Sequence, residues 1–253
     1  MHWLEVIGRW TLERLEQIGS AMLLVVDTCS QLTMINWRHT IQQMAYLGVD
    51  SLPIISLTLV FAGAVMTLQM ADVLITYGAQ STVGGIMAIA MGRELGPILV
   101  GVVLAGRVGA AITAELGAMK VTEQIDALRV MATNPIGYLV VPRVVACMIM
   151  VPILSFYGVL IGVGGGWFVA TYIKGLASLT YTTSIQNLAV ITDLIYGLIK
   201  ASVFGAVIAL VGAYKGMYTG SGARAVGNST TSSVVTSIIL IFILNYFLSV
   251  LLF

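Results

Sequence analysis

Residues 91–143 decide the fold of this chain and read MGRELGPILVGVVLAGRVGAAITAELGAMKVTEQIDALRVMATNPIGYLVVPR. The first part of this stretch is an apolar, helix-forming segment that carries Arg93, Glu94, Arg107 and Glu115. Each charge inside a membrane span costs roughly 2.5–3.5 kcal/mol on insertion scales, so such charges usually face a cavity or a partner. The segment passes directly into a short charged helix and a turn that contains proline. A span with buried charges, followed by a charged helix, indicates a membrane protein that is driven from outside the bilayer.

The charged helix is predicted over residues 120–132, where apolar and charged side chains separate onto two faces at about 100° per residue. The apolar face holds Val121, Ile125, Leu128 and Ala132, and the charged face holds Lys120, Glu123, Asp126 and Arg129. A free surface helix and a docking element both fit this pattern. The position of the helix between two spans favours a docking element for another protein.

The composition is that of an integral membrane protein. Of the 253 residues, 58% are hydrophobic and 9% are charged, against about 25% charged in a typical soluble domain. The mean hydropathy is +0.99. The net charge of +1 and the lack of a basic patch exclude a nucleic-acid partner. No catalytic constellation, metal-ligand spacing or phosphate-binding GxxxxGK[ST] loop is present, so we expect neither an enzyme nor a bound cofactor or metal.

The pattern predicts an all-α membrane protein with two regions, an N-terminal interfacial region over residues 1–50 and a five-span domain over residues 51–253. Residues 2–26 form an amphipathic pattern suited to a helix in the membrane interface, and residues 27–50 continue that layer. Five apolar segments are long enough to cross about 30 Å of hydrocarbon, at residues 51–71, 81–118, 144–173, 194–214 and 234–253. Residues 174–193 form an outer loop, and Gly96-Pro97 is expected to kink the second span.

The distribution of positive charge sets the predicted orientation. With the N-terminus in the cytoplasm and the C-terminus outside, the outer side holds only Lys174. The inner side holds eight basic residues: Arg9, Arg14, Arg38, Lys120, Arg129, Arg143, Lys215 and Arg224. This asymmetry follows the positive-inside rule.

The charges within the spans are the strongest functional signal. Arg93 and Glu94 on the second span and Lys200 on the fourth are expected at the same depth, about 15 Å below the outer surface at 1.5 Å per residue. They predict one polar network among apolar helices. The network is either an ion pair that only fixes the helix register or a binding site for a lipid headgroup.

Two further interpretations concern the first and second spans. Arg107 lies nearer the cytoplasmic face, where we expect it to extend to the headgroups or to pair with Glu115. Met66, Leu74 and Tyr77 lie around the outer end of the first span and are candidates for the wall that contacts acyl chains.

The runs RELGP, AGRVGAAITAELGAMKVTEQIDAL and NPIGYLVVPR resemble the signature of the MlaE (YrbE) permease family. The resemblance extends from about the first span to the C-terminus. It implies a permease subunit of an ABC transporter that moves phospholipid or a similar lipid between the inner membrane and the periplasmic side of a diderm bacterial envelope, in a system that maintains outer-membrane lipid asymmetry. It also implies a homodimer, a cytoplasmic ATPase that binds ATP and Mg, and a periplasmic MCE-domain protein.

The resemblance assigns roles to two sets of residues. Arg93, Glu94 and Lys200 are implied to line the lipid pocket. The helix over 120–132 is implied to be the coupling helix for the ATPase, with contacts from Lys120, Glu123, Asp126, Ala127, Leu128 and Arg129. Two other functions remain open from the residues alone: a gradient-driven carrier with Glu94 as the proton site, and a membrane scaffold that transports nothing.

Overall fold

The structure, a computed structural model, describes the backbone of residues 2–32 and 35–253. The side chains of residues 2–11, 13, 14 and 17 lie outside this description, and so do Trp3, Trp10 and much of the charged face expected for the N-terminal helix. The described helices are α1 (His2–Ser30), α2 (Trp37–Val49), α3 (Leu52–Thr76), α4 (Val83–Ala90), α5 (Gly96–Leu104), α6 (Ala110–Val121), α7 (Gln124–Val130), α8 (Val141–Phe168), α9 (Ser178–Leu188), α10 (Ile191–Met217) and α11 (Ala223–Leu252).

Five helical segments are long and apolar enough to cross a membrane. They are Leu52–Thr76, Gln80–Val121, Ile136–Ile173, Ile191–Met217 and Ala223–Leu252. The predicted all-α, five-span fold is therefore confirmed. The second segment runs through α4, α5 and α6 without leaving the helical conformation, because π-helical turns at Met91–Leu95 and Ala105–Gly109 join its parts.

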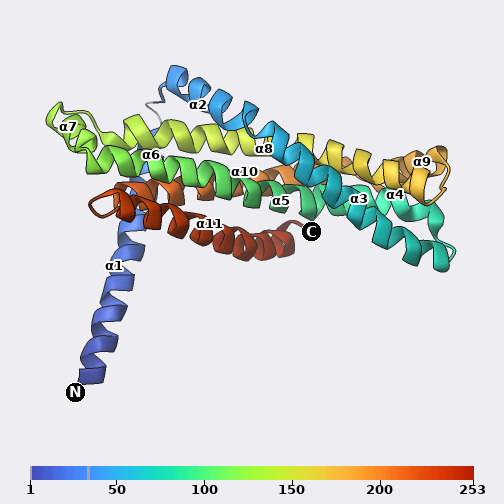
Figure 1. The fold of residues 1–253 in the computed structure, drawn as a ribbon, viewed down its shortest axis with the longest axis horizontal. Helices are drawn as coiled ribbons and strands as arrows, with labels where there is room; N and C mark the ends of the chain where they lie inside the picture. The colour runs from blue at the N-terminus through green and yellow to red at the C-terminus, as the bar shows by residue number, and fades with distance from the viewer. Residues whose placement is uncertain (1, 33–34) are drawn as a thin grey trace.

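The spans lie side by side along the long axis of the molecule (Figure 1). One end of the bundle carries α7, and the other carries α9 and the connection between α3 and α4; we call them the α7 end and the α9 end. The helix α11 starts at the α7 end and stops about midway along the bundle. The helix α1 projects from the α7 end at a steep angle to the spans, which is the arrangement expected of an interfacial helix.

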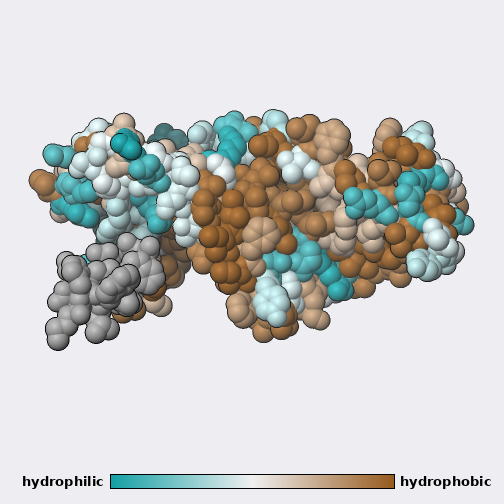
Figure 2. Space-filling model, turned by 60° about the horizontal axis from the view of Figure 1, so that its bottom comes forward, coloured by the Kyte–Doolittle hydropathy of each residue, from teal (hydrophilic) through white to brown (hydrophobic). Residues whose placement is uncertain are grey.

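The surface has the polarity of a protein that crosses a bilayer. Figure 2 shows apolar residues over the broad middle of the bundle and polar residues gathered toward both ends. A polar strip interrupts the apolar area on this face.

Small residues bring α3 and α8 together. Gly158, Gly162 and Gly166 recur at every fourth position of α8, a spacing that permits close helix approach. A Cβ atom on Gly63 of α3 would lie 2.0 Å from the carbonyl oxygen of Gly162. The backbones touch at this crossing, so this stripe packs within the chain.

Several element boundaries differ from the sequence expectation. The expected outer loop over 174–193 contains α9 and the first turn of α10, and most of the expected inner loop over 215–233 belongs to α10 and α11. Serine and threonine are frequent in both stretches, and these residues favour loops by composition. The bend expected at Gly96-Pro97 takes the form of the π-helical turn just before Pro97.

Candidate functional site

Lys200 and Glu94 form the centre of a polar cluster among the spans. The Nζ atom of Lys200 lies 2.9 Å from the Oε2 atom of Glu94 and also donates to the hydroxyl of Ser249 at 2.9 Å. Asn245 donates to Oε2 of Glu94 at 2.9 Å, and Ser249 donates to Oε1 at 2.8 Å. The side chain of Lys200 is 0% exposed, whereas that of Glu94 is 36% exposed. The predicted pairing of the second and fourth spans is confirmed.

Arg93 joins this cluster through Asp193, a residue that the sequence analysis did not select. Its Nη2 atom lies 2.8 Å from the Oδ1 atom of Asp193, at the start of α10. Its guanidinium also lies over the ring of Phe253, 4.7 Å from the centroid, and the ammonium of Lys200 lies 5.6 Å from the same centroid. An aromatic ring at this distance attracts a cation through its quadrupole. The cluster thus extends from Asp193 to the last described residue of the chain.

The local backbone explains why Lys200 bonds where it does. Pro97 has no N–H, so it cannot donate to the carbonyl oxygen of Arg93, four residues earlier. Lys200 donates to this oxygen at 3.0 Å. Close approach of α10 makes the bond possible, because a Cβ atom on Gly197 would lie 2.0 Å from the carbonyl oxygen of Gly92. The π-helical turn, the proline and the glycine together place the ammonium.

The cluster contains polar atoms that its internal hydrogen bonds leave unpaired. Three buried atoms, Nε of Arg93, Oδ2 of Asp193 and Oδ1 of Asn245, have no hydrogen-bond partner among the described residues. Buried polar groups are normally paired, so these atoms leave room for a further hydrogen-bond partner, as does the unpaired Nε of Arg143 outside the cluster. The side chain of Arg93 is 39% exposed. The cluster therefore presents a cation, a carboxylate and unused acceptors to a ligand in an otherwise apolar region.

The three residues expected in an apolar wall do not form one group. Met66 packs against the main core, and Leu74 packs against a smaller cluster at the α9 end that includes Ala71 and Tyr181. Tyr77 caps α3 and is exposed. Their contact with acyl chains stays a prediction.

The helix expected over 120–132 is broken into two pieces. Lys120 belongs to the last turn of α6, and Glu123 adopts a left-handed conformation with φ of 59° before α7 begins. Ile125 is buried and Leu128 packs against the core, but Val121 of the expected apolar face is exposed. The amphipathic pattern holds for α7 and fails across the turn that precedes it.

Three of the expected charged residues bond to one another. Asp126 accepts from Nζ of Lys120 at 3.0 Å and from Nη1 of Arg129 at 3.1 Å. The hydrogen bond from Lys120 lowers the pKa of the Asp126 carboxyl below its usual value. Two apolar residues that the sequence analysis did not select, Val130 and Met131, are exposed at the tip, Val130 to 88%. The exposed end of α7 is thus more apolar than the sequence pattern indicated.

The expected pairing of Arg107 with Glu115 is wrong. Arg107 bonds to Asp50 at 3.4 Å and to the hydroxyl of Ser51, whereas Glu115 bonds to Arg143 at 2.8 Å. Arg107 and Glu115 are eight residues apart on one helix, which separates them by about 12 Å along its axis. Partners on neighbouring helices are closer.

Comparison with known proteins identifies the family. A family model described as Permease MlaE matches residues 40–251. The chain belongs to the MlaE permease family. A probable ABC transporter permease protein of Rickettsia felis is 41% identical over 205 residues, which cover 80% of this chain and 79% of that protein. This MlaE-family chain is therefore a multi-pass membrane protein.

Two further relatives align over a smaller share of their own length. A probable ABC transporter permease protein of Synechocystis sp. is 46% identical over 175 residues, 69% of this chain and 66% of that protein. The chloroplastic protein TRIGALACTOSYLDIACYLGLYCEROL 1 of Arabidopsis thaliana is 37% identical over 175 residues, 69% of this chain and 50% of that protein. The match thus spans just under two thirds of the Synechocystis protein and half of the Arabidopsis protein.

Four members of the cluster in this MlaE-family chain were not predicted from the sequence: Asp193, Asn245, Ser249 and Phe253. A helical-spacing signal was available for three of them. Asp193 lies seven residues before Lys200, and Asn245 lies four residues before Ser249, so each pair shares one helix face. No such signal existed for Phe253, because its contact with Arg93 depends on where α11 stops.

Proposed function

We propose that this chain is the permease subunit of an ABC transporter that moves phospholipid or a similar lipid between the inner membrane and the periplasmic side of a diderm envelope. The observation that carries the proposal is the cluster around Glu94 and buried Lys200, in which Arg93 and Glu94 are partly exposed and atoms of Arg93, Asp193 and Asn245 are unpaired. A phosphate-bearing headgroup is attracted to the guanidinium of Arg93. The name of the Arabidopsis relative, which is that of a galactosylated diacylglycerol, also favours a glycerolipid.

A homodimer would enclose this cluster. The helix α11, which supplies Asn245 and Ser249, has only 11% of its apolar window buried. Its exposed large residues include Val235, Ile239, Phe242, Ile243, Tyr246, Phe247, Val250 and Leu251. A second copy packed on this face would shield the charges of the cluster from the hydrocarbon and leave the lipid between the two subunits.

The energy for transport is assigned to a partner. In this proposal a cytoplasmic ATPase binds ATP and Mg and docks on α7, while a periplasmic MCE-domain protein meets the α9 end. The α7 end then lies in the cytoplasm, with the N-terminus inside and the C-terminus on the periplasmic side, as the positive-inside asymmetry favours.

The lipid site is tested by replacing Glu94→Gln and Lys200→Met together. This pair removes both charges and keeps a carbonyl oxygen for the hydrogen bonds that Asn245 and Ser249 donate to residue 94. We expect a folded protein that carries less phospholipid after purification and no longer supports ATP-dependent lipid movement between vesicles.

The matched control replaces another ion pair between spans, Glu115→Gln with Arg143→Met. The control should retain wild-type lipid occupancy. Normal occupancy and transport in the Glu94/Lys200 double variant would contradict the headgroup site and leave only a bracing role. Transport that needs a proton gradient and no ATPase would favour the carrier, and no lipid movement under either condition would favour the scaffold.

The docking role of α7 is tested at its exposed apolar tip. The substitution Val130→Asp places a charge on a residue that is 88% exposed, so it should weaken co-purification with the ATPase while the spans still insert. Leu57→Asp, on an exposed apolar residue of the span α3, should instead impair insertion. If Val130→Asp still co-purifies with the ATPase and stimulates hydrolysis normally, α7 is not the docking element.

A further inference from the structure

Two cavities adjoin each other at the α7 end, and none of the residues of the charged cluster lines them. The first has a volume of about 570 Å³ and is lined by eight described residues that each carry a polar group: Glu16, Ser20, Tyr214, Lys215, Tyr218, Asn228, Ser229 and Ser232. The second has a volume of about 600 Å³ and is lined mainly by apolar residues of α1, α10 and α11. Tyr214 and Lys215 line both, so the two volumes form one cleft, which we call the α1 cleft.

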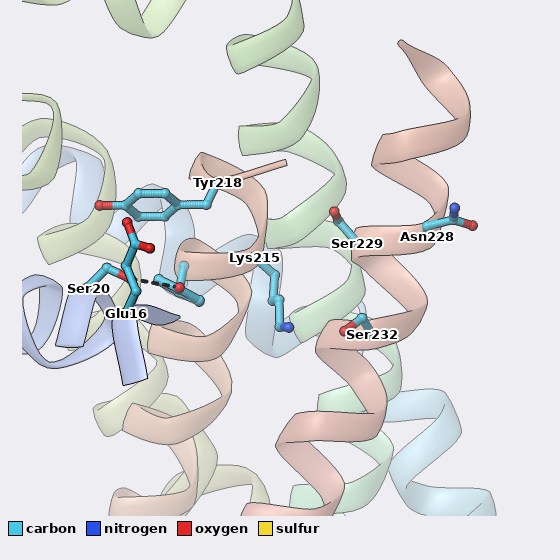
Figure 3. A pocket seen from close by; sticks show the side chains of 8 residues that line it. Glu16, Ser20, Lys215, Tyr218, Asn228, Ser229 and Ser232 are labelled. Atoms are coloured by element: carbon cyan, nitrogen blue, oxygen red, sulfur yellow. Dashed lines mark hydrogen bonds between the residues drawn. The ribbon is translucent and has the colours of Figure 1, made fainter. Parts of the chain in front are cut away.

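Among the described residues that line it, the polar part of the α1 cleft has one positive and one negative side chain. Figure 3 shows Glu16 and Ser20 on one side, Ser229 and Ser232 on the other, and Lys215 extending between them. Among the described side chains, neither Glu16 nor Lys215 has an ion-pair partner within 4.0 Å. The two charges thus face one hollow without neutralising each other.

The position of these groups matches the headgroup level of a membrane. Lys215 lies in the last turn of α10, and Tyr214 stacks against Tyr218 with a centroid separation of 4.9 Å. Tyrosine and lysine are typical of the membrane–water interface, where a ring or an alkyl stem lies in the apolar layer and the polar end reaches water.

The apolar part of the α1 cleft continues from there toward the bilayer interior. Its wall includes Ile18, Met22, Val25, Val207, Leu210, Val211 and Leu240. The helix α1 meets the bundle through buried Leu24 and through a hydrogen bond of 2.9 Å between Ser20 and Tyr214. Ile18 and Met22 stay exposed on the same helix. The space between α1 and the spans is therefore bounded by apolar side chains, and hydrocarbon fits it better than water does.

We propose that the α1 cleft binds one zwitterionic phospholipid that carries a primary amine, in the leaflet at the α7 end. The phosphate bonds to Lys215 and to the serine hydroxyls, the amine bonds to Glu16, and an acyl chain occupies the apolar part between α1 and α10. Charge complementarity selects this occupant, because the cleft offers one cation and one anion to one ligand. The bound lipid fixes α1 against the bundle.

This site is separate from the transported lipid of the proposed function. Its polar part lies near the start of α11, its apolar part reaches only as far as Leu240, and it shares no lining residue with the charged cluster that contains Asn245 and Ser249. Its test therefore measures bound lipid in a background where the charged cluster is disabled by Glu94→Gln and Lys200→Met.

The experiment uses the full chain in nanodiscs with equal amounts of phosphatidylethanolamine, phosphatidylglycerol and phosphatidylcholine. Lipid that stays bound after mild detergent extraction is counted by native mass spectrometry. We expect one retained phosphatidylethanolamine per chain. Lys215→Met should lower retention about tenfold, the effect of losing one hydrogen bond to a charged group. Glu16→Gln should lower the preference for phosphatidylethanolamine over phosphatidylglycerol about threefold, since Glu16 is exposed.

Two controls match these variants. Arg224→Met removes an exposed positive charge from the first turn of α11, outside the cleft lining, and should leave retention unchanged. Val211→Trp fills the apolar part without altering charge and should displace the lipid, whereas Ile199→Trp on the exposed face of α10 should not.

Two results would overturn the proposal. Equal retention of the three phospholipids, unchanged in every variant, would show that ordinary bulk lipid fills the cleft. Efficient disulfide cross-linking between two copies of a Ser229→Cys variant in the nanodisc would show that a second copy occupies it instead.

Discussion

Two of the ion pairs between neighbouring spans, Lys200 with Glu94 and Arg143 with Glu115, differ in what surrounds them. Lys200 and Glu94 lie 2.9 Å apart, with Asn245 and Ser249 also bonded to the carboxylate. Arg143 and Glu115 lie 2.8 Å apart, and the further bond of Arg143 goes to a backbone carbonyl four residues earlier. A single pair is sufficient to fix one helix against another. The additional side chains around Glu94 exceed that need, which favours a binding role for the first pair and a bracing role for the second.

The largest effect is expected when Glu94 alone is replaced by leucine. Lys200 is 0% exposed, so loss of its carboxylate leaves a buried, uncompensated cation at a cost of about 3–5 kcal/mol. Lys200→Met should lower the free energy of unfolding by less, because Glu94 remains partly exposed and keeps its hydrogen bonds from Asn245 and Ser249. Unfolding of the purified protein in detergent measures the free energy of unfolding of both variants. Equal losses of this free energy in the two single variants would show that burial does not determine the stability of this cluster.

A smaller effect is expected at the bracing pair. Glu115→Gln should lower the free energy of unfolding by about 1–3 kcal/mol, because the buried guanidinium of Arg143 loses a charged acceptor. The same unfolding measurement applies, and the lipid that co-purifies should not change. A loss of bound lipid in this variant would remove the functional distinction between the two pairs.

The smallest effect concerns the turn between α6 and α7. The pKa of Asp126 is lowered by its hydrogen bond from Lys120, so its stabilising contribution is present at neutral pH. The contribution is lost as the pH falls through the lowered pKa of the folded state. The protection factors of the amides of residues 122–130, which correct hydrogen exchange for its intrinsic pH dependence, should therefore fall in acid. Lys120→Gln should weaken this pH dependence, and an unchanged dependence in that variant would assign it to another group.

The spans and the central ion pair were predictable from the sequence for a simple reason. Charges are rare in apolar segments, and the constant rise of a helix converts residue number into depth. Glu94 and Lys200 therefore stood out at matching levels. Asp193 did not, because it follows a polar stretch that we interpreted as a loop. Its role depends on α10 starting at Ile191.

The details of the helix near α7 were less predictable. Glu123 takes a left-handed conformation, for which glycine is the usual signal, so the pattern over 120–132 appeared continuous. The partners of Arg107 and Glu115 depend on how α2 and α8 pack against the second span. Hydrophobic periodicity identifies the buried face of a helix but not which neighbouring charge meets it.

The helix α11 connects the two regions that the sequence singled out, the α6–α7 turn and the charged cluster. Near its start, Val226 packs beside Gly117 of α6, and near its end, Ser249 bonds to Glu94 and Lys200. The 26 helical steps from Ala223 to Ser249 span about 39 Å at 1.5 Å per residue. This helix therefore has one end beside the α6–α7 turn and the other end in the charged cluster. A tilt imposed at the α7 end displaces Asn245 and Ser249 together and withdraws two of the donors that hold the carboxylate of Glu94.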